Sequence, residues 1–260
     1  IADYLFGRVQ LQDPAGQAVA DAGYDIAIEA VADDINVADG EALRFQAVVD
    51  GVLPVDHELT WMVMDLIGTT VATGTGDTLE AVPSLPGVYF VALQSKAGGD
   101  VVKSAAATAV GHFRAQLTSA CGLAEVAGNG VPTDCQEVPI PVRMGITSLD
   151  IQATTGSLAD TANRGSIRLT DGMGNIVDAS QRGDAKHLKL GDEMYAYAVA
   201  ASTWDLDWYQ TVGAGEAEVV FDVDLTYGGM PDGVVMMAET VPPVAGLQWP
   251  DWLQGNVSLL

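Results

Sequence analysis

Basic residues are scarce in this chain of 260 residues, which contains 11 Lys and Arg against 35 Asp and Glu and carries a formal net charge of −24. A field of this sign repels phosphate groups, so we expect no nucleic acid and no anionic membrane surface among its partners. Such acidity keeps a surface solvated in salt, and it also attracts cations. Two explanations stay open: salt adaptation or plain solubility, and the binding of a specific cation.

Long apolar runs are also missing. A membrane-spanning helix needs about 18 or more consecutive apolar residues, but Asp65 interrupts the candidate at residues 60–72, and Gly, His and Arg interrupt the one at residues 104–114. We therefore expect no membrane span. Hydrophobic residues still make up 48% of the chain, which is enough to form the cores of a folded protein, and the length favours two domains.

The motifs of common catalytic sites are absent. "HELTW" at residues 57–61 begins like the zinc-protease motif H-E-x-x-H, but Trp61 stands where the second His is required. There is no Gly-x-Ser-x-Gly elbow, no Walker-type loop and no complete dinucleotide-binding loop. We expect no enzymatic activity. A glycan hydrolase that uses two carboxylates ranks last among the alternatives, because a chain with 35 acidic residues places some pair at catalytic spacing in any fold.

Cysteine is limited to Cys121 and Cys135, which flank the loop "GLAEVAGNGVPTD". Their spacing fits neither a metal knuckle nor a redox pair. A disulfide across this loop would contribute about 3 kcal/mol in the chain-entropy model and would indicate an oxidising compartment. The alternative is a pair of buried, reduced thiols.

Alternation of apolar and polar residues, with turns at close intervals, dominates the sequence and is typical of an antiparallel β-protein. Residues 103–113 are rich in Ala, but they follow the hairpin-like "AGGD", so a strand is favoured there as well. We expect an all-β fold of antiparallel β-sandwich domains, one immunoglobulin-like and the other a β-sandwich or jelly-roll-like domain. The clearest expected strands are residues 8–12, 24–31, 42–49, 58–64, 88–95, 166–170 and 194–201.

Residues 40–110 carry a specific pattern, in which "GEALRFQA" is followed by Trp61 in "LTWMV" and by "PGVYFVAL". The pattern resembles the immunoglobulin-like sandwich of the polycystic kidney disease (PKD) type, although the Gly that usually follows close behind the Trp is delayed to Gly68. The resemblance implies that Trp61 fills the core between the sheets and that Tyr89 makes a corner hydrogen bond. Modules of this family act mostly as spacers or binding surfaces of extracellular proteins.

The chain divides into four expected segments: an N-terminal strand segment at 1–35, an Ig/PKD-like sandwich at 36–114, a disulfide-bearing connector at 115–141 and a second β-rich domain at 142–260. In the connector, Pro139 and Pro141 disfavour a central strand. The apolar N-terminal strand either completes a sheet of its own molecule or adds to the edge of a sheet in another molecule.

Residues 204–225 predict a hairpin around the turn "GAGE" at 213–216. One face of this hairpin is apolar, and the other places Asp205 opposite Asp224 and Asp207 opposite Asp222. Like charges across a ladder are destabilising, so we expect compensation by salt, by a bridging Ca²⁺ or by basic residues of a neighbouring strand or subunit. Solvated carboxylates on an outer face are the simplest alternative. No cofactor is required, and Ca²⁺ is the one candidate.

The C-terminal tail places Trp249 and Trp252 among prolines. They either cover the end of the second domain or form an aromatic platform for a sugar or a neighbouring protein. We expect an extracellular, cell-surface or virion-surface structural protein, such as a surface-layer, filament, appendage or virion-surface subunit. It would act through self-association or contacts with other surface proteins. The alternative is a carbohydrate-binding or adhesive module whose partners are glycans.

Overall fold

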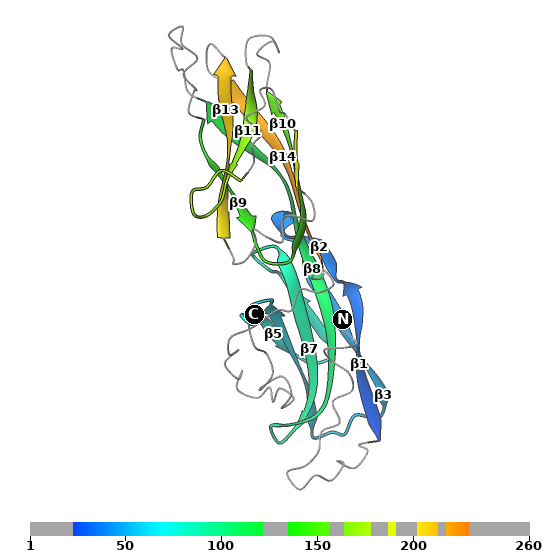
Figure 1. Ribbon diagram of the computed structural model, residues 1–260. Coiled ribbons are helices and arrows are strands. Elements are labelled where there is room, and N and C mark those ends of the chain that lie inside the picture. Colours follow the sequence, from blue (N-terminus) through cyan, green and yellow to red (C-terminus); the bar gives the residue numbers. More distant parts are fainter. Residues whose placement is uncertain are drawn as a thin grey trace.

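The protein is built almost entirely of β-strands (Figure 1), which confirms the expected all-β class. The computed structural model describes residues 23–121, 135–155, 164–177, 187–190, 202–212 and 217–228. The expected strands at 8–12 and 194–201 lie outside these residues. No helix in the described ranges is long and apolar enough to cross a membrane. The elements are β1 (Tyr24–Ala32), β2 (Asp34–Asn36), the 3₁₀ turn η1 (Val37–Asp39), β3 (Leu43–Gly51), β4 (His57–Asp65), β5 (Thr70–Thr75), β6 (Thr78–Ala81), β7 (Gly87–Ala97), β8 (Asp100–Cys121), β9 (Val138–Val142), β10 (Ile146–Thr155), β11 (Arg164–Thr170), β12 (His187–Leu190), β13 (Ser202–Val212) and β14 (Ala217–Tyr227).

The first sandwich packs the sheet β1–β3–β6 against the sheet β8–β7–β4–β5. Trp61 lies between the sheets with 2% of its surface exposed, and its indole N–H donates to the carbonyl of Gly76 at 2.8 Å. The hydroxyl of Tyr89, at the start of β7, donates to the carbonyl of Leu85. Both features implied by the immunoglobulin-like resemblance are therefore present in the first sandwich.

The second sandwich packs the sheet β12–β10–β14–β8 against the sheet β11–β13–β9. Its core contains Trp204, Leu206 and Trp208 from β13 and Phe221 from β14, all of them buried. The strand β9 carries Pro139 and Pro141, and among the described strands it pairs only with β13. It is an edge strand, which is where a sheet tolerates residues without a backbone N–H.

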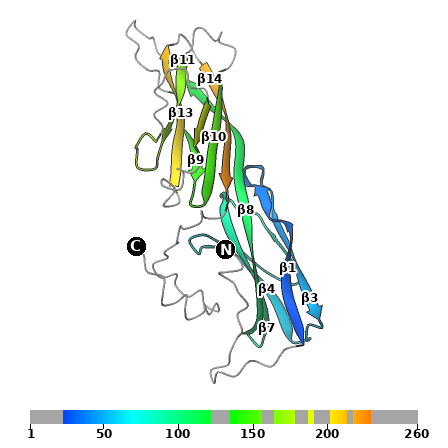
Figure 2. The ribbon, with the colours of Figure 1, turned by 45° about the vertical axis from the view of Figure 1, so that its right-hand side comes forward.

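One strand, β8, belongs to both sandwiches. It pairs with β7 over residues 100–111 and with β14 over residues 113–121, and its 22 residues extend for about 70 Å. Figures 1 and 2 show the two sandwiches end to end along this strand. The strand thus continues through residue 115, where the connector was expected to begin.

The predicted hairpin of residues 204–225 is wrong. β13 lies between β11 and β9, whereas β14 lies between β10 and β8, so the two strands belong to opposite sheets. Their apolar faces do point into the core as predicted, with Leu206 and Phe221 fully buried. Two strands that each have one apolar face can bury those faces equally well as neighbours in one sheet or as opposing strands of a sandwich. Alternation alone does not distinguish these arrangements.

Candidate functional site

The four predicted acidic residues do not form one cluster. Asp205 and Asp207 lie on β13, and Asp222 and Asp224 lie on β14 in the opposite sheet. The cross-hairpin arrangement proposed for a bridging Ca²⁺ is therefore overturned. Within the described ranges, no group of three or more His, Cys, Asp or Glu residues is placed to hold a metal ion.

Asp207 is compensated by a basic residue on the neighbouring strand. Arg168 of β11 lies directly opposite it in the ladder, and the Arg168 Nε atom lies 2.9 Å and 3.0 Å from the two carboxylate oxygens. A second contact joins Arg168 Nη2 to Asp207 Oδ2. Asp207 is only 3% exposed, so this outward-facing carboxylate is buried and depends on its guanidinium partner.

Asp222 and Asp224 belong instead to an exposed polar surface on the outer side of the sheet β12–β10–β14–β8. Strand pairing aligns outward-facing side chains of four strands into two rows, which we call the polar face. An open hollow of about 550 Å³ lies over its β10, β14 and β8 part. The first row is Lys189, Asp150, Asp224 and Arg114, and the second is His187, Gln152, Asp222 and Gln116.

Neighbouring side chains of the polar face bond to one another across the strands. Gln116 Nε2 donates to Asp222 Oδ1 at 2.7 Å, and Arg114 Nε lies 3.4 Å from Asp224 Oδ1. Asp150 Oδ2 accepts a hydrogen bond from Lys189 Nζ at 3.0 Å, and Asp150 Oδ1 lies 2.8 Å from His187 Nε2. Burial raises the pKa of Asp150, but the hydrogen bonds and charges of Lys189 and His187 outweigh it and hold that pKa below its usual value.

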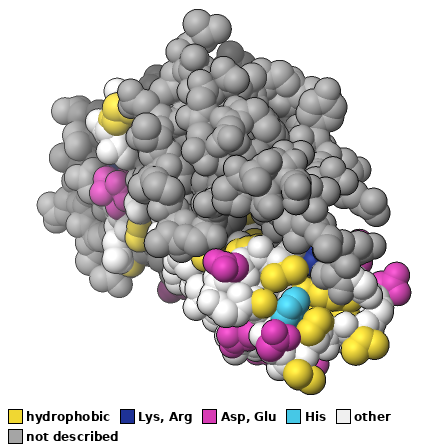
Figure 3. Space-filling model, turned by 90° about the horizontal axis from the view of Figure 1, so that it is seen from below, with side chains coloured by type: hydrophobic (Ala, Val, Ile, Leu, Met, Phe, Trp, Pro, Cys, Tyr) yellow, Lys and Arg dark blue, Asp and Glu magenta, His cyan; other side chains and the backbone are white. Residues whose placement is uncertain are grey.

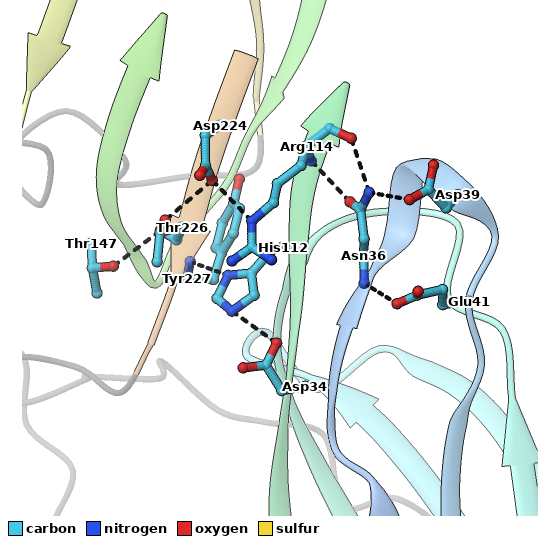
Figure 4. Close-up of polar contacts among 10 residues, drawn as sticks. All are labelled: Asp34, Asn36, Asp39, Glu41, His112, Arg114, Thr147, Asp224, Thr226 and Tyr227. Carbon is cyan, nitrogen blue, oxygen red and sulfur yellow. Dashed lines mark hydrogen bonds and ion pairs between the residues drawn. The ribbon is translucent and has the colours of Figure 1, made fainter. Parts of the chain in front are cut away.

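A second polar cluster lies where the two sandwiches meet, around the buried ring of His112 on β8 (Figure 4). The backbone N–H of Tyr227, at the end of β14, donates to His112 Nδ1 at 3.0 Å. Because Nδ1 accepts this bond, the ring proton lies on Nε2, which is 3.1 Å from Asp34 Oδ1 on β2. One side chain thereby connects β2 of the first sandwich with β14 of the second.

Arg143 and Asp65 form a second connection at this junction. Arg143, which follows β9, places Nη2 3.0 Å from Asp65 Oδ2 at the end of β4, and their side chains are only 14% and 10% exposed. The other oxygen of Asp65 accepts the backbone N–H groups of Ile67 and Thr69 at 3.1 Å and 2.8 Å. Asp65 therefore has partners for both oxygens, as a buried carboxylate requires.

Two tyrosine hydroxyls complete the junction. Tyr227 Oη accepts the backbone N–H of Arg143 at 3.2 Å and donates to the carbonyl of Pro141 at 2.7 Å. Burial raises the pKa of Tyr89 to about 12, and burial raises the pKa of Tyr227 as well. Both hydroxyls therefore stay protonated at neutral pH and act as fixed hydrogen-bonding groups.

Asn36 adds a third connection, at the end of β2. Its side-chain amide donates to the carbonyl of Arg114 and accepts the N–H of Arg114, both at 2.9 Å, as Figure 4 shows. The Asn36 side chain thus makes the two hydrogen bonds to the backbone of Arg114 that a neighbouring strand would otherwise make. His112, Arg143, Asp65 and Asn36 were not predicted from the sequence, because each is an isolated polar residue and no local pattern indicates a partner that is distant along the chain.

The remaining predicted residues are only partly described. Cys135 is buried and disulfide-bonded, and no described cysteine is free. The side chain of Cys121 lies outside the described residues, so its pairing with Cys135 stays a prediction. Trp249, Trp252 and the N-terminal strand also lie outside them.

The lower end of the first sandwich presents apolar side chains beside acidic ones (Figure 3). Val52 and Val55, in the loop between β3 and β4, are almost fully exposed. Just inside this end, the hydroxyl of Tyr24 lies 2.7 Å from both His57 Nδ1 and Ser95 Oγ. Ser95 is completely buried, so these hydrogen bonds stabilise the packing of β1 on β4 and β7.

Comparisons with known proteins identify no family. No protein-family model matches the chain, and no curated protein matches it. A carbohydrate-binding module of the β-sandwich superfamily is similar at 12% identity and a TM-score of 0.30, over 80% of this chain and all of that one. A tandem-repeat structure from the extending region of a large adhesion protein is similar at 16% identity and a TM-score of 0.31, over 84% of this chain and 54% of that one.

A CARDB domain from Pyrococcus furiosus, crystallised in complex with di-metal ions, is similar at 15% identity and a TM-score of 0.26. That match covers 34% of this chain and 91% of the other. At these identities and TM-scores the matches assign neither a family nor a role, and the likeness of residues 40–110 to PKD domains remains a resemblance.

Proposed function

We propose that this protein is a rigid structural module of an extracellular surface assembly, in which two β-sandwiches act as one stiff unit. The observation that carries the proposal is the continuity of β8 through both sandwiches. Flexibly joined domains are usually separated by an exposed linker that few contacts cross. Here the two units share a hydrogen-bonded strand.

The junction contacts support the same role. Bending β8 near His112 would separate Tyr227 and Asp34 from the same imidazole ring. It would also separate Arg143 from Asp65, leaving each without its oppositely charged partner in a mostly buried place. A spacer or assembly subunit needs fixed geometry rather than chemistry, and the role therefore requires no catalysis and no cofactor.

Residual dipolar couplings measured by NMR test the rigidity. We expect a single alignment tensor to fit the amides of both sandwiches. Arg143→Met should lower the unfolding free energy by about 2 kcal/mol, because it leaves Asp65 without its charged partner, and it should weaken agreement with a single tensor. Arg44→Met, which removes the exposed Arg44–Glu80 pair within the first sandwich, is the matched control and should change stability by less than about 0.5 kcal/mol.

Two independent tensors for the unaltered protein would contradict the proposal. Electron microscopy of the purified protein tests the assembly role separately. We expect ordered polymers or arrays at high protein concentration, whereas isolated particles under all conditions would restrict the role to that of a spacer within a larger protein.

A further inference from the structure

We propose that the polar face of the second sandwich binds a neutral polyhydroxylated ligand, that is, an uncharged carbohydrate chain. This site is independent of the structural role proposed above. It is formed by side chains of the four neighbouring strands β12, β10, β14 and β8, and part of it is hollowed. With strands about 4.8 Å apart, each row extends for about 14 Å, which suits a short stretch of a sugar chain.

The balance of charge indicates the chemical class of the ligand. In the whole chain, acidic residues outnumber basic ones 35 to 11, but the polar face has the three carboxylates of Asp150, Asp222 and Asp224 with Arg114 and Lys189 interleaved. An anion would meet these carboxylates and the strongly negative chain. A metal ion would have to displace the cations that already bond to Asp150 and Asp224. A neutral ligand incurs neither cost.

The polar face also retains hydrogen-bonding groups that its own contacts leave unused. The bonds of Asp222 and Asp224 use Oδ1, and Arg114 uses Nε. Within the described part of the chain, the Oδ2 atoms of both carboxylates, the terminal nitrogens of Arg114 and the amide of Gln152 make no hydrogen bond. Acceptors and donors thus alternate across the face. Adjacent sugar hydroxyls, which both donate and accept, are complementary to this pattern.

The side chains of the polar face are held in place before any ligand arrives. Cross-strand bonds join Gln116 to Asp222 and Arg114 to Asp224, and all of these residues stand on paired strands rather than on loops. Such preorganisation lowers the entropy cost of binding. Among the residues that the structure describes, no aromatic side chain lines the hollow, so these residues offer no stacking and we expect dissociation constants in the millimolar range.

The test is an NMR titration of the full chain with three neutral hexasaccharides, built from glucose, mannose or galactose. We expect at least one of them, at up to tens of millimolar, to shift the amides of residues 114–116, 150–152 and 222–224 and the side-chain amide of Gln152. The double variant Gln152→Ala/Asp222→Ala should weaken this binding at least tenfold while its amide spectrum remains that of the folded protein. Arg44→Gln, on the exposed pair of the other sandwich, should bind like the unaltered protein.

Several outcomes would overturn the proposal. They are the absence of shifts with all three oligosaccharides, shifts located elsewhere on the surface, and undiminished binding by a folded double variant. A parallel titration with CaCl₂ distinguishes a metal site. Saturable shifts of the same amides with Ca²⁺, and none with sugar, would show that the carboxylates serve a cation instead.

Discussion

β13 and β14 have nearly the same local pattern, "WDLDW" in one and "FDVDL" in the other, but Asp207 and Asp222 have opposite environments. Asp207 is buried and bonded to Arg168, whereas Asp222 is exposed and belongs to the polar face. The apolar residues of the two strands behave alike, because both sets point into one core. The comparison teaches that alternation decides which side of a strand faces the core. The neighbouring strands decide whether a carboxylate on the other side is paired and buried or stays exposed.

The inward faces of β13 and β14 should be equally intolerant of charge, which is the largest effect we expect. Leu206→Asp and Val223→Asp each bury a carboxylate without a partner and should cost more than about 4 kcal/mol, enough to unfold the second sandwich. Val220→Asp, at an outward-facing and partly exposed position of β14, is the control. Urea unfolding followed by circular dichroism measures all three. A folded Leu206→Asp protein would contradict the observed orientation of β13.

The predicted disulfide would join the two sheets that carry these strands. Cys121 ends β8 in the sheet of β14, and Cys135 precedes β9 in the sheet of β13. Replacing both cysteines by Ser should lower the unfolding free energy by about 3 kcal/mol. Intact mass before and after reduction checks the bond directly, since reduction of the disulfide adds two hydrogens. An unchanged mass would mean that the two cysteines are not bonded to each other.

The outward-facing aspartates should differ from one another. Asp207→Asn removes the charge that faces Arg168 in a buried place and should cost about 2 kcal/mol. Asp222→Asn on the polar face should change stability by less than about 0.5 kcal/mol. Chemical denaturation of the two variants under identical conditions measures the difference. Equal effects would show that burial of Asp207 is unimportant.

The smallest expected effect concerns Asp150, the neighbour of Asp224 on β10. Its pKa is lowered in the folded protein, so its contribution to stability is present above the usual pKa of 3.8 and is lost as the pH falls through the lower folded value. Lys189→Met should shift the Asp150 pKa upward towards that usual value. An NMR titration that follows the Asp150 carboxyl carbon measures the shift. An unchanged pKa would indicate that Lys189 does not interact with Asp150 in solution.

Several features could be predicted from the sequence because neighbours along the chain determine them. Turn residues and alternation indicated the strands, and the pattern around Trp61 and Tyr89 indicated that Trp61 is buried between sheets and that Tyr89 makes a corner hydrogen bond. The two features at Trp61 and Tyr89 are confirmed by burial and by the bond to Leu85. The prolines of β9 correctly disfavoured a central strand.

The candidate sites depend instead on which strands become neighbours. Arg168 and Asp207 are 39 positions apart, and Arg114 and Asp224 are 110 apart. His112 meets Tyr227 only because β8 runs on into the second sandwich.

By itself, the sequence determined the class of fold, the core-facing side of β13 and β14 and the excess of negative charge, because these follow from side-chain chemistry and the two-residue period of a strand. The tertiary structure alone decided that Asp207 is paired and buried while Asp222 is open. It did so because the choice of neighbouring strand is made by the packing of whole sheets, and that packing places a cation beside one carboxylate and an amide beside the other.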